Sequence, residues 1–236
     1  MATAPKRSEL NVFTSNSMRA VLDQLGPEFE RASGYKLAVS YSPAKAMLRR
    51  LAAGETADLA ILSAPAIESV AEQGKLDKRT LRALGRCGIG VGVKSGTRKP
   101  DVSSLDAFKR ALLEAKSIVH TVEGASGIHF VDVIQKLGIA DAVHAKATRH
   151  AGGLVGEVLV KGNVELGIQQ IPELLAVPGV EVVGPLPSEI QQYSNATAGI
   201  FAEASNREGA QALIDFLVTP SSVQVFRAKG FEAAAA

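Results

Sequence analysis

The sequence predicts an α/β fold of two doubly wound lobes joined by crossover strands. First, strand patterns and helix patterns alternate from residue 10 onward, which is typical of parallel strands connected by helices. Second, 236 residues are enough for two lobes of about a hundred residues each. Third, an apolar strand over residues 87–93 and a long strand over residues 193–201 are placed to connect the two lobes. We expect residues 1–88 and 196–236 in one lobe and 89–195 in the other.

Composition and charge exclude several classes of function. Hydrophobic residues make up 46% of the chain and charged residues 21%, as in globular proteins. No apolar run approaches the ~20 residues that a membrane-spanning helix requires, so we expect no membrane insertion. The 26 basic and 24 acidic side chains are scattered along the chain, so we expect no nucleic-acid partner. The single cysteine, Cys87, excludes an internal disulfide, and we predict a buried thiol, no metal site and no cofactor.

The first strand and helix contain the clearest candidate for a binding site. Residues 10–14 form an apolar run of strand formers, and apolar residues recur at helical spacing from Met18 to Phe29. The turn between them holds Ser15, Asn16 and Ser17. The first turn of a helix has free N–H groups and a partial positive charge, so such a turn can hold an anion. An ordinary helix cap is the alternative, but a cap needs only one such residue.

The remainder of the first lobe repeats this unit twice. Strands over residues 35–42 and 58–63 are each followed by a helix, the first opened by Pro43 and the second by residues 64–66. In open parallel sheets, ligands bind at the carboxyl ends of the strands. We therefore expect Ser17, Ser42 and Ser63 to meet at one edge of the sheet. A short helix over residues 78–84 then precedes the strand that enters the second lobe.

The second lobe is predicted to follow the same pattern. A helix from Ser104 leads to a strand over residues 117–122, and the small-residue turn of residues 123–127 opens the next helix. A short edge strand over residues 146–150, a helix over 154–161 and strands over 165–170 and 180–183 follow. The return strand and two amphipathic helices complete the chain.

The order of these segments resembles the type II periplasmic solute-binding proteins, and specifically their molybdate-binding branch. The resemblance covers residues 10–232 and rests on five segments: Val12-Phe13-Thr14-Ser15-Asn16-Ser17, Ala57-Asp58-Leu59, Ala125-Ser126-Gly127-Ile128, Leu166-Gly167-Ile168-Gln169-Gln170 and Ala228-Lys229-Gly230-Phe231. It implies two lobes that close on a small ligand in the cleft between them.

The resemblance also implies which residues contact the ligand. Molybdate-binding members surround the oxyanion with hydroxyl and N–H groups, and two of their positions match Ser17 and Ser126. A serine is expected within residues 43–45, where this chain has Lys45, and a tyrosine is expected where it has Gln170. An ammonium group in place of a hydroxyl suits a carboxylate, so we expect an organic di- or tricarboxylate, with an oxyanion such as molybdate as the alternative.

Five charged or titratable side chains and one turn complete the candidate site. Arg149 and His150 precede Gly153 and its turn and would donate to the ligand from the second lobe, unless they form a solvent-facing strand edge. Lys45 is equally compatible with a solvated position in the first turn of its helix. His129 and Glu123 are candidate bases. The alternatives are a hydrogen-bonded structural histidine and a carboxylate that favours a helix start.

Two functions remain open on this fold. The first is a solute-binding protein that closes on a small anion without changing it. The second is a cofactor-independent isomerase of a tricarboxylate, similar to aconitate isomerases, in which His129 or Glu123 would move the proton. Residues 1–8 contain no apolar signal segment, so we expect a cytoplasmic protein as the sequence stands, and a periplasmic one if a leader was removed. An exported protein would serve an ABC transporter permease, and we expect a monomer.

Overall fold

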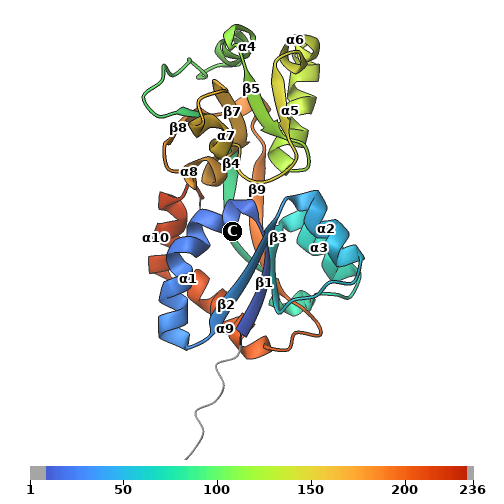
Figure 1. Cartoon of the computed structure of the whole chain (residues 1–236). Helices are drawn as coiled ribbons and strands as arrows, with labels where there is room; N and C mark the ends of the chain where they lie inside the picture. The colour runs from blue at the N-terminus through green and yellow to red at the C-terminus, as the bar shows by residue number, and fades with distance from the viewer. Residues whose placement is uncertain (1–8, 233–236) are drawn as a thin grey trace, which may run out of the picture.

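The computed structural model describes residues 9–232, which form two α/β lobes, one above the other in Figure 1. The prediction that residues 1–8 contain no apolar signal segment lies outside this range. The elements of the lower lobe, here lobe one, are β1 (Glu9–Ser15), η1 (Asn16–Met18), α1 (Arg19–Ser33), β2 (Lys36–Ser42), α2 (Ala44–Ala52), β3 (Leu59–Ser63), α3 (Ala64–Glu72), η2 (Lys78–Thr80), α9 (Arg207–Leu217) and α10 (Pro220–Ala228).

The upper lobe, here lobe two, is joined to lobe one by β4 (Arg82–Lys94) and β9 (Tyr193–Ile200). Its other elements are α4 (Leu105–Glu114), β5 (Ile118–Thr121), α5 (Ala125–Lys136), α6 (Ala140–His144), β6 (Ala147–His150), α7 (Gly156–Val160), β7 (Leu166–Gln170), α8 (Ile171–Leu175), β8 (Val180–Pro185) and η3 (Ser188–Ile190).

The strands follow the order β2-β1-β3-β9-β4-β7-β5-β6, with β8 on β4. β1 pairs in parallel with β2 and β3, and β5 pairs in parallel with β6 and β7, as the alternation of strands and helices predicted. β4 changes partner within its length, because residues 82–88 pair with β9 and residues 89–94 pair with β7 and β8. The predicted lobe boundaries stay a prediction, which this change of partner at residue 89 supports.

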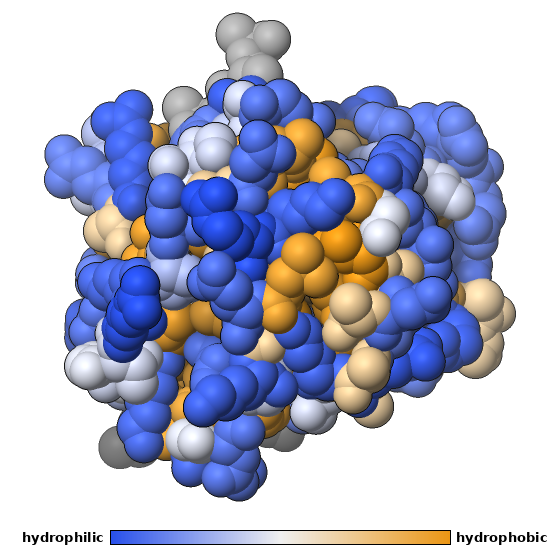
Figure 2. Space-filling model, turned by 90° about the horizontal axis from the view of Figure 1, so that it is seen from above, coloured by the Kyte–Doolittle hydropathy of each residue, from blue (hydrophilic) through white to orange (hydrophobic). Residues whose placement is uncertain are grey.

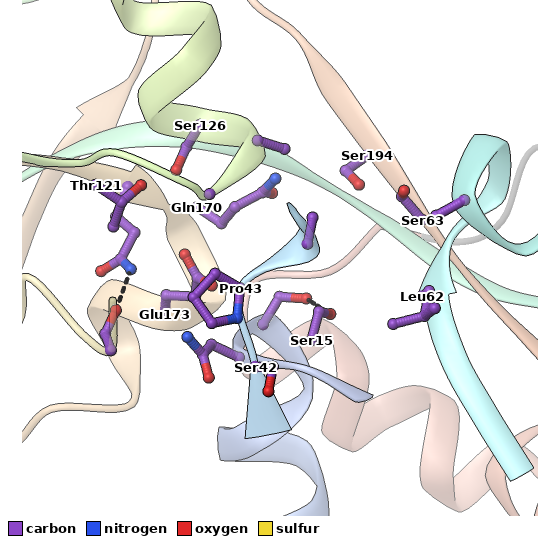
Figure 3. Close-up of a pocket in the computed structure, with 18 residues that line it drawn as sticks. Ser15, Ser42, Pro43, Leu62, Ser63, Thr121, Ser126, Gln170, Glu173 and Ser194 are labelled. Atoms are coloured by element: carbon purple, nitrogen blue, oxygen red, sulfur yellow. Dashed lines mark hydrogen bonds between the residues drawn. The ribbon is translucent and has the colours of Figure 1, made fainter. Parts of the chain in front are cut away.

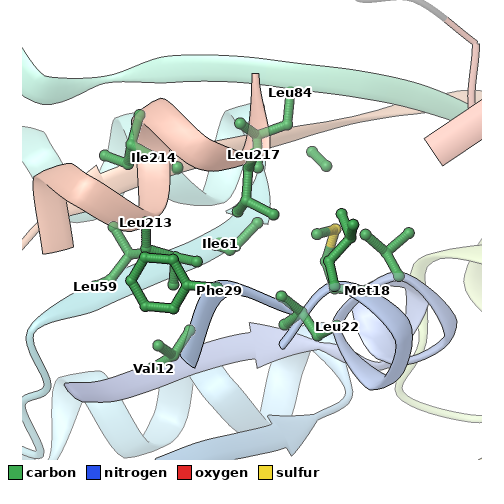
Figure 4. Close-up of a cluster of buried hydrophobic side chains, with 14 of the residues drawn as sticks. Val12, Met18, Leu22, Phe29, Leu59, Ile61, Leu84, Leu213, Ile214 and Leu217 are labelled. Atoms are coloured by element: carbon green, nitrogen blue, oxygen red, sulfur yellow. The ribbon is translucent and has the colours of Figure 1, made fainter. Parts of the chain in front are cut away.

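Each lobe has its own hydrophobic core. In lobe one, Phe29 of α1 packs with Leu59 and Ile61 of β3 and with Leu213 and Leu217 of α9 (Figure 4). A second cluster covers the other face of this sheet. In lobe two, a separate cluster surrounds two fully buried aromatic rings of α4 and α5, those of Phe108 and Phe130. Burial of these side chains fixes the two sheets, and with them the strand ends that face the other lobe.

The structure corrects one local prediction and adds two short helices. The predicted helix over residues 78–84 is only the single turn η2, because β4 already begins at Arg82 and pairs with β9. The side chain of Leu84 is consequently buried in the core of lobe one. The short helices α6 and α8 were not predicted, since each has only five residues and too few turns for an apolar period.

The outer surface is mostly polar. Viewed from above, hydrophilic side chains cover most of the face shown in Figure 2, and hydrophobic side chains appear between them. Among residues 9–232, no helix has both the length and the apolar character needed to cross a bilayer.

Candidate functional site

A cavity of about 50 Å³ lies between the lobes, where the strand ends of both sheets face each other (Figure 3). Its walls come from both lobes and are mostly small and polar. The lining residues are Ser15, Asn16, Ser17, Ser42, Pro43, Ala44, Leu62, Ser63, Ala66, Thr121, Gly124, Ala125, Ser126, Gly153, Gln169, Gln170, Glu173 and Ser194. Ser17, Ser42 and Ser63 meet here, as predicted from the positions of their strands.

Lobe one contributes hydroxyl groups at the ends of three strands. The Oγ atoms of Ser15 and Ser17 are 2.8 Å apart in a hydrogen bond across the η1 turn. Arg50 Nη1 donates to the Oγ atoms of Ser40 and Ser42, at 2.8 and 3.2 Å. Because Ser42 accepts from a guanidinium, its own hydroxyl proton is available to a group in the cavity. The guanidinium of Arg50 therefore does not line the cavity itself and reaches it only through the hydroxyl of Ser42.

Three helices of the described chain that begin at the cavity have no side-chain cap. The helices α2, α3 and α5 begin at the cavity with Pro43, Ser63 and Gly124 in the cap position, and no side chain caps them. The helices α4, α9 and α10 begin elsewhere and are each capped by a side chain, those of Ser104, Asn206 and Thr219. The free N–H groups and partial positive charge of three helix starts therefore face the cavity.

In lobe two, the start of α5 is packed tightly against the end of β5. A Cβ atom at Gly127 would lie 1.8 Å from the carbonyl oxygen of Thr121, and one at Gly124 would lie 2.5 Å from Thr121 Oγ1. Only glycine permits this approach at residue 127, and it brings Ser126 and Thr121 to the cavity. Thr121 Oγ1 is buried and has no hydrogen-bond partner among the described residues, so it is a free donor at the wall.

Two glutamines at the end of β7 are held by their own hydrogen bonds. Gln169 Nε2 donates to the carbonyl of Gly153 at 3.0 Å, and Gln169 Oε1 accepts from Val155 N at 2.8 Å, which fixes the turn before α7. Gln170 Oε1 accepts from Cys87 Sγ at 2.8 Å. The amide nitrogen of Gln170 is therefore left to donate. Cys87 is buried as predicted, and burial raises the pKa of its thiol, so it stays protonated.

Glu173 is the one carboxyl group among the described residues that line the cavity. It lies in the first turn of α8 with 9% of its surface exposed. Burial raises its pKa to about 8, although hydrogen bonds from the Gln170 N–H and the Gln169 side chain oppose this shift. At neutral pH Glu173 is therefore mostly protonated and uncharged.

The structure brings six of the predicted site residues to the cavity, namely Ser15, Asn16, Ser17, Ser126, Gly153 and Gln170. The predicted cations are not among the lining residues. Lys45 and Arg149 are exposed, and His150 is half-buried on the edge strand β6. No Lys, Arg or His lines the cavity in the described chain, so the positive potential at its wall comes from helix starts.

The two candidate bases also lie outside the lining. Glu123 Oε2 forms an ion pair of 2.9 Å with Arg49 Nη2 of α2, which lowers the pKa of the Glu123 carboxyl and connects the two lobes. His129 Nε2 is 2.7 Å from the carbonyl oxygen of Ile190. His129 is thus hydrogen-bonded, as in the structural alternative for this residue, and Glu123 has an ion-pair partner that the sequence did not predict.

Sequence reasoning missed Thr121 and Glu173 as cavity residues. Thr121 is a hydroxyl residue at the end of a strand that precedes a helix, as Ser15 is, and this pattern could have identified it. Glu173 follows Gln170 by three residues in a Gln-Ile-Pro-Glu sequence, which fits a helix start with an acidic residue in its third position. Its burial depends on the packing of α8 between the lobes, which has no local signal.

Comparisons with known proteins agree with this architecture. Residues 10–232 match the family described as bacterial extracellular solute-binding protein. An aconitate isomerase of a Pseudomonas species is 29% identical over 229 residues, which cover 94% of this chain and 87% of that protein. The molybdate-binding protein ModA of Escherichia coli is 23% identical over 228 residues, which cover 94% of this chain and 88% of ModA.

Solved structures show the same fold at lower identity. The periplasmic molybdate-binding protein of Azotobacter vinelandii superposes with a TM-score of 0.78 and 16% identity, covering 96% of this chain and all of that one. A periplasmic thiamin-binding protein superposes with a TM-score of 0.74 and 15% identity, covering 100% of this chain and 86% of that one. The predicted fold class and the resemblance to the molybdate-binding branch are confirmed.

Proposed function

Because the chain belongs to the bacterial extracellular solute-binding protein family, we propose that it closes its two lobes on a small anion held in the cavity. The observation that carries this proposal is the meeting of three uncapped helix starts, those of α2, α3 and α5, at a wall of hydroxyl and amide groups. Partial positive charges converge there without a side chain to neutralise them. An anion would satisfy these N–H groups.

We assign the anion to the organic di- and tricarboxylates. This choice rests on the aconitate isomerase relative, whose identity exceeds that of the molybdate-binding relatives, and on Gln170 at the position where the resemblance predicts a tyrosine. It does not rest on Lys45, which is exposed.

Isothermal titration calorimetry with citrate, trans-aconitate, sulfate and molybdate tests this proposal. We expect saturable binding of a carboxylate, competed by the others only at higher concentration. Selective binding of molybdate would overturn the carboxylate assignment while leaving anion binding intact. No binding of any of the four anions to the purified protein would overturn the proposed function.

A second candidate function is the isomerisation of a tricarboxylate, which the 29% identical aconitate isomerase favours. Moving a double bond by one position requires a base that removes a proton from one carbon while a proton is added at the other end of the three-carbon unit. Among the described residues that line the cavity, Glu173 is the carboxyl group that could exchange a proton with the substrate, and it would have to be ionised to act as the base. Glu123 and His129 have other partners.

Incorporation of deuterium into trans-aconitate in deuterated buffer, followed by NMR, separates the two functions. Exchange in the wild-type protein that is lost in Glu173→Gln and kept in Glu123→Gln and His129→Ala would support the isomerase. Binding without exchange would leave the solute-binding function alone.

The family supports a proposal for the partner and the location of the protein. A solute-binding protein delivers its ligand to a permease, so we propose an ABC transporter permease as the partner of an exported form. The family description places its members outside the cytoplasm. Fractionation of cells that produce the protein from its native gene, with and without a leader, tests this part of the proposal.

A further inference from the structure

The position of Glu173 connects the cavity to the junction between the lobes. Its helix, α8, follows β7 of lobe two but packs on η1 and α1 of lobe one, as well as on β4 and β8. The Glu173 side chain therefore faces the cavity beside the serine-rich turn of lobe one (Figure 3). Any ligand that contacts that turn lies close to this carboxyl group.

Glu173 has no counter-ion among the described residues. η1 and β7 contain no ionisable side chain, and no charged side chain of the other described elements packed on α8 forms an ion pair with Glu173: Arg19 of α1 lies over the Tyr41 ring, Arg86 of β4 pairs with Glu232, and Glu181 of β8 pairs with Lys99. Cys87 of β4 is buried and protonated. The carboxyl group is thus surrounded by neutral partners, the N–H of Gln170 and the side chain of Gln169.

An ionised carboxylate in such a place is costly. Burial without a counter-ion disfavours the charged form, and a bound anion would add repulsion between like charges. A protonated carboxyl group avoids both costs and gains a donor that can point at the ligand. An anion and a proton therefore occupy the site together more favourably than the anion alone.

We propose that Glu173 keeps its proton in the complex and donates a hydrogen bond to the bound anion, so that the anion and one proton are held together. This inference rests on the proposed solute-binding function. It specifies the ligand further: the atom next to Glu173 is an acceptor, such as an oxygen of a fully ionised carboxylate or oxyanion. A ligand hydroxyl that could only donate at this position would be disfavoured.

The test is the pH dependence of the affinity for trans-aconitate and for molybdate, measured by calorimetry at pH 7 and pH 9. Both probes are fully ionised across this range, and Cys87 remains protonated. With Glu173 titrating near pH 8 in the free protein, its protonated fraction falls about tenfold over this interval, and we expect Kd to rise about tenfold. Glu173→Gln keeps a donor but cannot ionise, so its Kd should change little with pH.

Two further variants keep the test decisive. Glu157→Gln removes an exposed carboxylate of α7 outside the cavity wall and should keep the tenfold change. Glu173→Met has neither a proton nor a donor and should bind at least tenfold more weakly at pH 7. An equal pH dependence in the wild type and in Glu173→Gln would overturn the inference.

A ligand-free measurement separates this inference from the proposed function. In ¹³C NMR of carboxyl-labelled protein, one glutamate signal that is absent from Glu173→Gln should titrate near pH 8. If no probe binds, the proposed function fails, and this titration still decides whether Glu173 carries a proton. A titration midpoint near the ordinary glutamate value, about 4.3, would overturn the inference even if the anions bind.

Discussion

Two serines at helix starts give the sharpest test of the cavity. Ser126 lies in the first turn of α5, is 1% exposed and lines the cavity. Ser104 precedes α4, where its Oγ accepts a hydrogen bond from Ala107 N at 3.2 Å and caps the helix. Replacing either serine by alanine removes one hydroxyl, so the two variants differ only in where that hydroxyl lies.

The two substitutions are expected to change different quantities. A hydrogen bond to a charged ligand contributes about 1.5–3 kcal/mol, so Ser126→Ala should raise Kd by roughly 10- to 150-fold. Ser104→Ala should leave Kd unchanged and lower the free energy of unfolding by about 1 kcal/mol, the usual value of an N-cap. Calorimetry with trans-aconitate and molybdate gives the first quantity, and urea denaturation gives the second.

Two results would refute the assignment of the cavity. One is an unchanged Kd in Ser126→Ala, provided that the variant unfolds at the same urea concentration as the wild type. The other is a large rise of Kd in Ser104→Ala, because the anion would then depend on a helix start that the structure places away from the cavity.

Three further predictions concern packing, pH and salt. Gly127→Ala should lower the free energy of unfolding by at least about 3 kcal/mol, because its Cβ would lie 1.8 Å from a backbone oxygen of β5, whereas Gly26→Ala, with 3.4 Å to a side chain, should cost little in denaturant titrations. The raised pKa of Glu173 means that the folded state loses stability as pH rises from about 4.5 to about 8, by roughly 1.4 kcal/mol per unit, and thermal scans of Glu173→Gln should lack this loss. Glu123→Gln removes the exposed ion pair with Arg49 and should speed ligand release up to about fivefold in stopped-flow experiments, an effect that high salt should reproduce in the wild type and not in the variant.

Sequence patterns identified most of the fold because they are local. Alternating strands and helices predicted the parallel pairings of β1 and β5, and the polar turn at Ser15 to Ser17 marked one wall of the cavity. The strand start at Arg82 was missed, since its pairing partner, β9, lies more than a hundred residues further along the chain. Pairing between distant segments leaves no periodic signal in either of them.

The charged candidates show where residue type alone is insufficient. Lys45, Arg149 and His150 have the right chemistry for an anion and lie close in sequence to cavity residues, but the structure leaves them outside the wall. Whether a first-turn lysine faces inward depends on the helix orientation, which the packing of α2 on β1 determines. Glu173 shows the converse. A glutamate in a short helix is common, and the burial that makes this one unusual arises only because the two lobes enclose it.

The location of α8 between the lobes has a further consequence. A five-residue helix that touches both lobes changes its surroundings whenever the angle between them changes. Opening would admit water to Glu173 and lower the cost of ionising it. Release of the ligand would then be accompanied by loss of a proton from Glu173, and high pH would favour the ligand-free, open form.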